Sequence, residues 1–105
     1  MKKIYLFCSA GMSTSMLAQK MQDVATSHDL PIKVQAFPEG KLGQIIEEDR
    51  PDVILLGPQV KYMYEGVCEK YGHEGIPIQV IDQADYGMMN GEKVLKSAIK
   101  LMKKK

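Results

Sequence analysis

The sequence predicts an α/β fold: a single three-layer α/β/α domain, residues 1–105, built on a four-stranded parallel sheet. Two observations predict it. Short apolar runs typical of buried strands alternate along the chain with segments of helical periodicity, and several runs end in glycine, proline or small residues. Strands that alternate with helices join into parallel sheets through right-handed crossovers, with helices on both faces.

The first strand and the first helix are expected to meet at a loop of small residues. Residues 4–8 are apolar and partly aromatic, which predicts a buried strand that carries Cys8 at its carboxyl end. A helix is expected from Ser13, with Ser13 or Thr14 as its N-cap. One face of this helix collects residues at helical spacing, namely Leu17, Met21, Val24, Ala25 and His28.

The next two strands are expected to occupy different positions in the sheet, one at its edge and one at its centre. Residues 32–37 alternate apolar and polar side chains, as an edge strand does, and a short helix is expected over residues 41–48. Residues 52–57 are almost continuously apolar, which is typical of a central strand covered by helices on both faces. A further helix is expected over about residues 60–71.

The last third of the chain completes the sheet. A fourth strand is expected over residues 77–82, followed by a turn at Tyr86-Gly87 and an amphipathic helix with apolar residues from Val94 to Met102. Four such strands are most simply ordered 2-1-3-4. In this order the chain direction reverses between strands one and three, which opens a crevice at their carboxyl ends. Cys8 stands at that crevice.

The loop that follows Cys8 has the composition of an anion-binding site. Its backbone N–H groups can converge on phosphate oxygens, Gly11 allows dihedral angles that other residues avoid, and the positive end of the next helix attracts negative charge. That field also favours the thiolate, the nucleophilic form of cysteine. We therefore expect Cys8 to be a nucleophile. The expected phosphate-binding residues are Ser9, Ala10, Gly11, Met12, Ser13, Thr14 and Ser15. The alternative is a buried structural cysteine next to a capped helix.

These residues resemble the enzyme IIB domains of the lactose/cellobiose class of the bacterial sugar phosphotransferase system. The resemblance rests on the loop segment 6–15 and extends over nearly the whole chain, particularly toward the cellobiose and chitobiose branch, through residues 36–39, 52–59, 80–82 and 86–87. It implies that Cys8 accepts a phosphoryl group from a phosphohistidine of enzyme IIA. It also implies that Cys8 passes the group to a sugar entering through the membrane transporter, enzyme IIC.

Composition excludes several other classes. No stretch reaches the roughly 18 consecutive apolar residues of a spanning helix, and the start lacks a signal-peptide cleavage site, so we expect a cytoplasmic protein without membrane insertion. The formal net charge is +1, and the lysines at 103–105 suit the negative end of a helix, so no nucleic-acid partner is expected. Cys68 is expected to be a bystander, because it falls within the helix after strand three and no anion-binding loop is predicted there. His28 and His73 have no third ligand group nearby, so no metal site is expected, and no cofactor is expected either.

A carrier must present its cysteine to enzyme IIA and to enzyme IIC in turn, so we expect a monomer that keeps this face uncovered. We hypothesise that Met12 and Tyr86 contribute an exposed apolar ring on which the two partners dock. Gln59, Pro38-Glu39 and Asp82 lie at the other strand ends, and the sequence assigns them no step.

The main alternative is a hydrolase similar to the low-molecular-weight tyrosine phosphatases, which also begin with a cysteine-containing phosphate loop. Their pattern C-x5-R places an arginine where this chain has Thr14, and the sole arginine, Arg50, precedes the third strand at the opposite end of the sheet. Asp82 and Asp85 lie near the crevice as candidates for a general acid. A receiver-like module is a weaker alternative, because Gly57 occupies the place of its phosphoacceptor aspartate.

Overall fold

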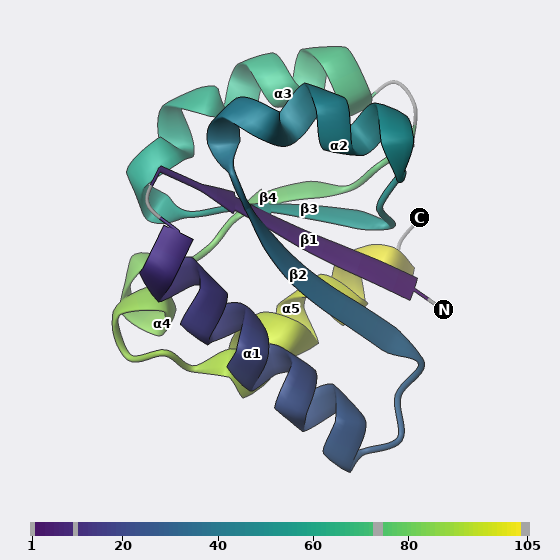
Figure 1. Ribbon diagram of the computed structural model, residues 1–105, viewed down its shortest axis with the longest axis vertical. Helices are drawn as coiled ribbons and strands as arrows, with labels where there is room; N and C mark the ends of the chain where they lie inside the picture. The colour runs from purple at the N-terminus through teal and green to yellow at the C-terminus, as the bar shows by residue number, and fades with distance from the viewer. Residues whose placement is uncertain (1, 10, 73–74, 104–105) are drawn as a thin grey trace.

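The predicted architecture is confirmed by the computed structural model, which describes residues 2–9, 11–72 and 75–103. Within these residues four parallel strands form one sheet in the order β2-β1-β3-β4, as expected (Figure 1). The strands are β1 (Lys2–Cys8), β2 (Ile32–Pro38), β3 (Val53–Leu56) and β4 (Ile78–Val80). The helices are α1 (Gly11–Ser27), α2 (Leu42–Glu48), α3 (Tyr64–Tyr71), α4 (Gln83–Gly87) and α5 (Gly91–Lys103), with short 3-10 helices η1 (Glu39–Lys41) and η2 (Pro58–Met63).

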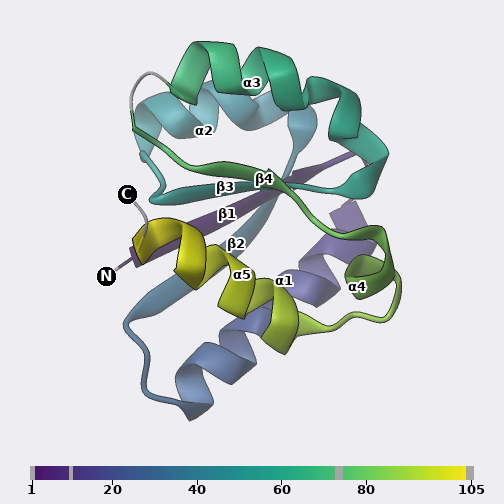
Figure 2. The ribbon, with the colours of Figure 1, turned by 180° about the vertical axis from the view of Figure 1, so that it is seen from behind.

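Helices cover both faces of the sheet. Figures 1 and 2 show α2 and α3 on one face and α1, α4 and α5 on the other. Successive side chains of a strand point to opposite faces, so β1 contributes to two separate apolar layers. Ile4 and Leu6 pack in the layer under α1 and α5, whereas Tyr5 and Phe7 pack in the layer under α2 and α3.

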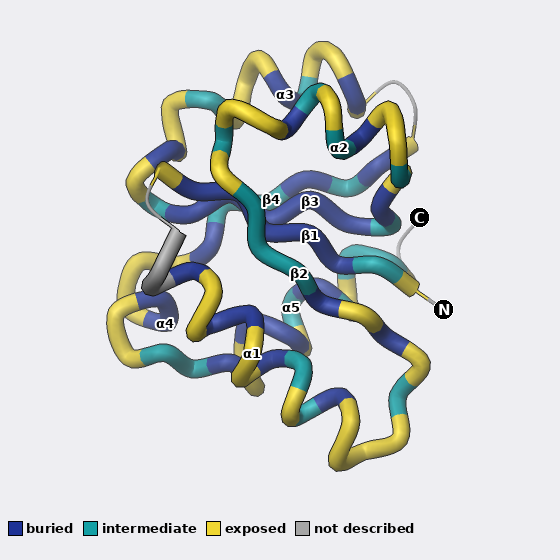
Figure 3. The backbone as a smooth tube through the Cα atoms, viewed as in Figure 1, coloured by how far each residue is buried: buried dark blue, intermediate teal, exposed yellow. Residues whose placement is uncertain are grey.

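The two central strands are the most deeply buried part of the molecule (Figure 3). All four residues of β3 are buried, which confirms the prediction of a central strand covered on both faces. The edge position of β2 is also confirmed, because its burial alternates and declines toward Pro38. None of the helices in the described ranges combines the length and apolar character needed to cross a bilayer.

Two predictions of local structure are wrong, one about an N-cap and one about a turn. α1 begins at Gly11, so Ser13 and Thr14 lie inside the helix rather than at its N-cap. The Thr14 hydroxyl contacts Tyr86 instead of capping the helix. The expected turn at Tyr86-Gly87 is instead the end of α4, a helix capped by Asp82, whose carboxylate accepts the backbone N–H groups of Ala84 and Asp85.

Asp49 ties the amino end of β1 to the end of α2. Its carboxylate accepts hydrogen bonds from the Lys3 ammonium and the Tyr5 hydroxyl. The hydrogen bond from Lys3, and next that from Tyr5, lowers the pKa of Asp49 below its ordinary value of 3.8. Burial, and next the bond to Asp49, raises the pKa of Tyr5. The folded state therefore favours the charged form of Asp49.

Replacing Asp49 with asparagine is expected to destabilise the fold at about pH 7 and to matter much less at about pH 2. A carboxyl whose pKa is lowered by folding contributes stability above its unfolded pKa, and it loses that contribution as the pH falls through its folded pKa. Urea unfolding of the wild type and of Asp49→Asn at both pH values measures the difference. An equal difference at the two pH values would contradict this account.

Close contact between α1 and α5 depends on Gly91, which is buried at the start of α5. A Cβ at Gly91 would lie 2.9 Å from the carbonyl carbon of Lys20 and 2.9 Å from the backbone nitrogen of Met21. We expect Gly91→Ala to lower the free energy of unfolding by about 1–3 kcal/mol through overpacking. The matched control is Gly66→Ala in α3, where a Cβ would meet nothing within 4 Å. This change is expected to stabilise the fold by about 0.5–1 kcal/mol, and equal effects in urea unfolding would refute the assignment.

Candidate functional site

Cys8 ends β1 at the carboxyl edge of the sheet. Its Cα partner on β2 is Pro38, and on the other side the Gly57 N–H donates to the Phe7 carbonyl at 2.8 Å. The chain leaves β1 for α1 on one face of the sheet and leaves β3 for α3 on the other (Figure 1). Cys8 therefore lies at the topological switch point, as predicted. Only 1% of the residue is exposed, although Ser9, which follows it, is exposed.

The start of α1 follows Cys8 after a short connection. The first N–H groups of an α-helix have no partners within that helix, and together with the helix dipole they form a ready site for an anion. The first turn of α1 contains no acidic residue. Ala10 and the side chains of Met12 and Ser13 lie outside the described residues, whereas the backbone of Gly11 begins α1. The structure thus brings Cys8 and the start of α1 together at one edge.

Thr14 and Ser15, the last two predicted loop residues, have different surroundings. Ser15 is exposed, whereas Thr14 is fully buried. The Thr14 Oγ1 lies 2.9 Å from the Tyr86 hydroxyl oxygen in a buried hydrogen bond. The Thr14 hydroxyl is therefore directed at α4, and it ties the first turn of α1 to the segment after β4.

This contact overturns the hypothesis of an exposed apolar ring for Tyr86. Only 8% of Tyr86 is exposed, because its ring packs with the apolar layer under α1 and α5 and its hydroxyl reaches Thr14. The Met12 side chain lies outside the described residues. The large apolar side chains that the described structure does expose are Met16, Tyr62, Tyr64 and Met88.

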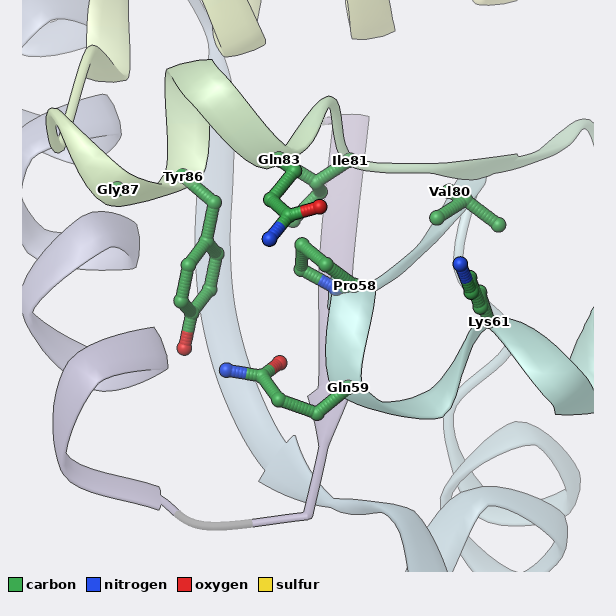
Figure 4. A pocket seen from close by; sticks show the side chains of 8 residues that line it. All are labelled: Pro58, Gln59, Lys61, Val80, Ile81, Gln83, Tyr86 and Gly87. Atoms are coloured by element: carbon green, nitrogen blue, oxygen red, sulfur yellow. The ribbon is translucent and has the colours of Figure 1, made fainter.

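A pocket of about 570 Å³ lies beside this site, at the carboxyl ends of β3 and β4. Figure 4 shows the carboxamide of Gln59 directed toward the Tyr86 hydroxyl from the opposite wall. Apolar surface comes from Val80 and Ile81, and the polar groups belong mainly to glutamines, a tyrosine and a lysine. The lining residues are Pro58, Gln59, Lys61, Val80, Ile81, Gln83, Tyr86 and Gly87, none of which is acidic.

Gly57 lies between Cys8 and Gln59, which lines the pocket. A Cβ at Gly57 would lie 2.7 Å from the Gln59 Oε1 and 3.0 Å from the Cys8 Cβ, so the absence of a side chain lets both groups approach the same point. From the sequence alone, Gly57 is expected to end a strand in place of a phosphoacceptor aspartate, and Gln59 is assigned no step. The sequence signal that could have identified them is a glycine at the end of a central strand, followed two positions later by a glutamine.

The candidate residues for a phosphatase either lie toward the opposite edge of the sheet or make other contacts. Arg50 precedes β3 and therefore lies toward the amino edge, opposite Cys8. Asp82 caps α4, and Asp85 is largely buried and lies 3.4 Å from the Lys93 ammonium. No group of three or more histidine, cysteine or acidic residues that could hold a metal occurs in the part of the chain that the structure describes.

Comparison with known proteins gives a consistent result. Residues 3–97 match the family model "PTS system, Lactose/Cellobiose specific IIB subunit". The chain is 42% identical over 104 residues, 96% of each chain, to the galactose-specific EIIB component of Lactococcus lactis subsp. cremoris (strain MG1363). It is equally similar, with the same coverage, to the cellobiose-specific EIIB component of Lactococcus lactis subsp. lactis (strain IL1403). The solution structure of a cellobiose-specific phosphotransferase IIB component from Borrelia burgdorferi superposes with a TM-score of 0.80 at 42% identity, covering 99% of this chain and 94% of that one.

Removing the Tyr86 hydroxyl with Tyr86→Phe is expected to lower the free energy of unfolding by about 1–3 kcal/mol, because the buried Thr14 hydroxyl loses its partner. Thr14→Val alone is expected to have a cost of similar size. Urea unfolding of both single variants and of the double variant forms a thermodynamic cycle. The double variant should cost clearly less than the two single variants together. Strict additivity would show that the hydrogen bond contributes nothing.

Proposed function

We propose, from the premise that this chain belongs to the family of lactose/cellobiose-specific IIB subunits of the sugar phosphotransferase system, that Cys8 is its phosphoryl carrier. In this proposal Cys8 accepts a phosphoryl group from a phosphohistidine of enzyme IIA. It then passes the group to a sugar entering through the membrane transporter, enzyme IIC. The observation that supports the proposal best is the position of Cys8 at the switch point, directly before the N-terminal end of α1.

Both transfers conserve protons and electron pairs. In the first, the Cys8 sulfur attacks phosphorus, an S–P bond forms, and the N–P bond of the phosphohistidine breaks with its electron pair left on the imidazole nitrogen. The proton released by the thiol neutralises that nitrogen. In the second, a sugar hydroxyl oxygen attacks phosphorus, the S–P bond breaks with its electron pair on sulfur, and the hydroxyl proton returns to the thiol.

The surroundings of Cys8 suit a carrier better than a hydrolase. The donors expected at the loop are backbone N–H groups and hydroxyls, which bind phosphate oxygens and do not activate water. The arginine of the phosphatase pattern is replaced by Thr14, whose hydroxyl is engaged with Tyr86. Asp82 and Asp85 are the two carboxyls that the sequence offers as a general acid. Asp82 caps α4, and Asp85 forms an ion pair with Lys93. The phosphoryl group would therefore stay on the Cys8 sulfur, without hydrolysis, until a partner accepts it.

The proposed acceptor is a sugar of the cellobiose or chitobiose type. Support comes from the two cellobiose-specific relatives at 42% identity, although a relative of equal identity is galactose-specific. We propose that the carrier acts in the cytoplasm as a monomer, because the face around Cys8 has to meet the donor and the transporter in turn.

The test uses the reduced protein, phosphorylated enzyme IIA and intact-mass measurement under mild conditions. Wild type is expected to gain one phosphoryl group and Cys8→Ser none, while Cys68→Ser, which removes the other thiol, should behave as wild type. A parallel assay measures hydrolysis of an aryl phosphate, which should not be turned over. Brisk hydrolysis without any adduct would assign the protein to the phosphatases. An adduct that survives in Cys8→Ser would place the carrier residue elsewhere.

A further inference from the structure

Gln59 is an exposed residue at the start of η2, and it lies close to the same glycine, Gly57, as Cys8 does. Gly57, whose N–H is bonded to the Phe7 carbonyl of β1, connects β3 to η2, and Pro58 and Gln59 are the first two residues of η2. The Gln59 Oε1 and the Cys8 Cβ both lie against the point where a Gly57 side chain would begin. Gln59 therefore approaches the cysteine from β3, on the side of β1 away from β2.

The far side of the Gln59 carboxamide faces a fixed group. Its amide nitrogen points toward the Tyr86 hydroxyl, as Figure 4 shows, and that hydroxyl is held by the buried Thr14. The last torsion of a glutamine side chain is broad and roughly two-fold, so a half-turn exchanges the amide oxygen and nitrogen without moving the rest of the residue. A half-turn thus directs the N–H donor of this side chain toward a phosphoryl oxygen on Cys8.

Charge at the pocket favours an anion on this side. The described residues that line the pocket are neutral except for Lys61. A phosphoryl group on Cys8 carries close to two negative charges at neutral pH, and a carboxamide N–H can bind it without acting as an acid or a base. A carboxamide therefore serves a carrier, because it stabilises the phosphoryl group and supplies no means to hydrolyse it.

We propose that Gln59 is a catalytic residue that donates a hydrogen bond to the phosphoryl group during its transfer to Cys8. This inference rests on the proposed function and extends it beyond the loop after β1. Gln59 would bind the group from the pocket that Gln83 and Tyr86 also line.

The test compares Gln59→Met with Gln44→Met in the Cys68→Ser background. Methionine keeps the length of the side chain and removes both the donor and the acceptor. Gln44 is exposed on α2, where its amide contacts Glu48, so this variant controls for the loss of a surface carboxamide. Two rates are measured: phosphoryl acceptance from phosphorylated enzyme IIA, and alkylation of the unphosphorylated Cys8 thiol by iodoacetamide.

We expect Gln59→Met to slow phosphoryl acceptance about tenfold or more, as befits a lost hydrogen bond to a charged group, with alkylation changed by less than about twofold. Gln44→Met should match the parent protein in both rates. Acceptance at the parental rate in Gln59→Met, with a parent protein that does accept phosphate, would overturn this inference and leave the proposed function intact. Equal slowing of acceptance and alkylation would also overturn it, because Gln59 would then act on the thiol. A parent protein that gains no phosphoryl group would overturn both proposals.

Discussion

The pairing of β1 between β2 and β3 is the constraint on which the rest of the structure depends. Because β1 is paired on both sides and covered on both faces, every side chain from Ile4 to Phe7 is buried, and the strand has no freedom to shift its register. The connections that leave β1 and β3 go to opposite faces of the sheet. The end of β1 therefore lies at an edge that neither connection crosses, and the residue at that end is Cys8.

A second consequence of this arrangement concerns the kind of group that can hold a phosphate there. The helix after the cysteine offers partial charges that are fixed by the backbone, and the start of η2 offers the neutral carboxamide of Gln59. Neither would change its protonation state when the proposed phosphoryl group arrives or leaves. A site of this kind can bind the group without lowering the barrier for attack by water, which distinguishes a carrier from a hydrolase that uses a loop arginine and a general acid.

The sequence predicted most of the fold because the signals for it are local. The continuous apolar run of β3, the alternation in β2 and the loop after Cys8 indicate which strand is central, which lies at the edge and where β1 ends. The order 2-1-3-4 is then the simplest arrangement of the four strands. What it missed depends on contacts between distant residues. Thr14 and Tyr86 are 72 positions apart, so a hydroxyl near the start of a helix was interpreted as an N-cap and a buried phenol as part of an exposed ring. The place of Gln59 depends on Gly57 lying against Cys8, which only the pairing of β1 with β3 determines.

The most direct test of the central claim is phosphorus NMR of the protein after phosphorylation by enzyme IIA. The account predicts one protein-bound resonance of a phosphorus–sulfur linkage, with coupling to the β-protons of Cys8. A resonance typical of a phosphorus–nitrogen linkage on a histidine, or one coupled to the β-protons of Cys68, would contradict it and would place the phosphoryl group away from the switch point.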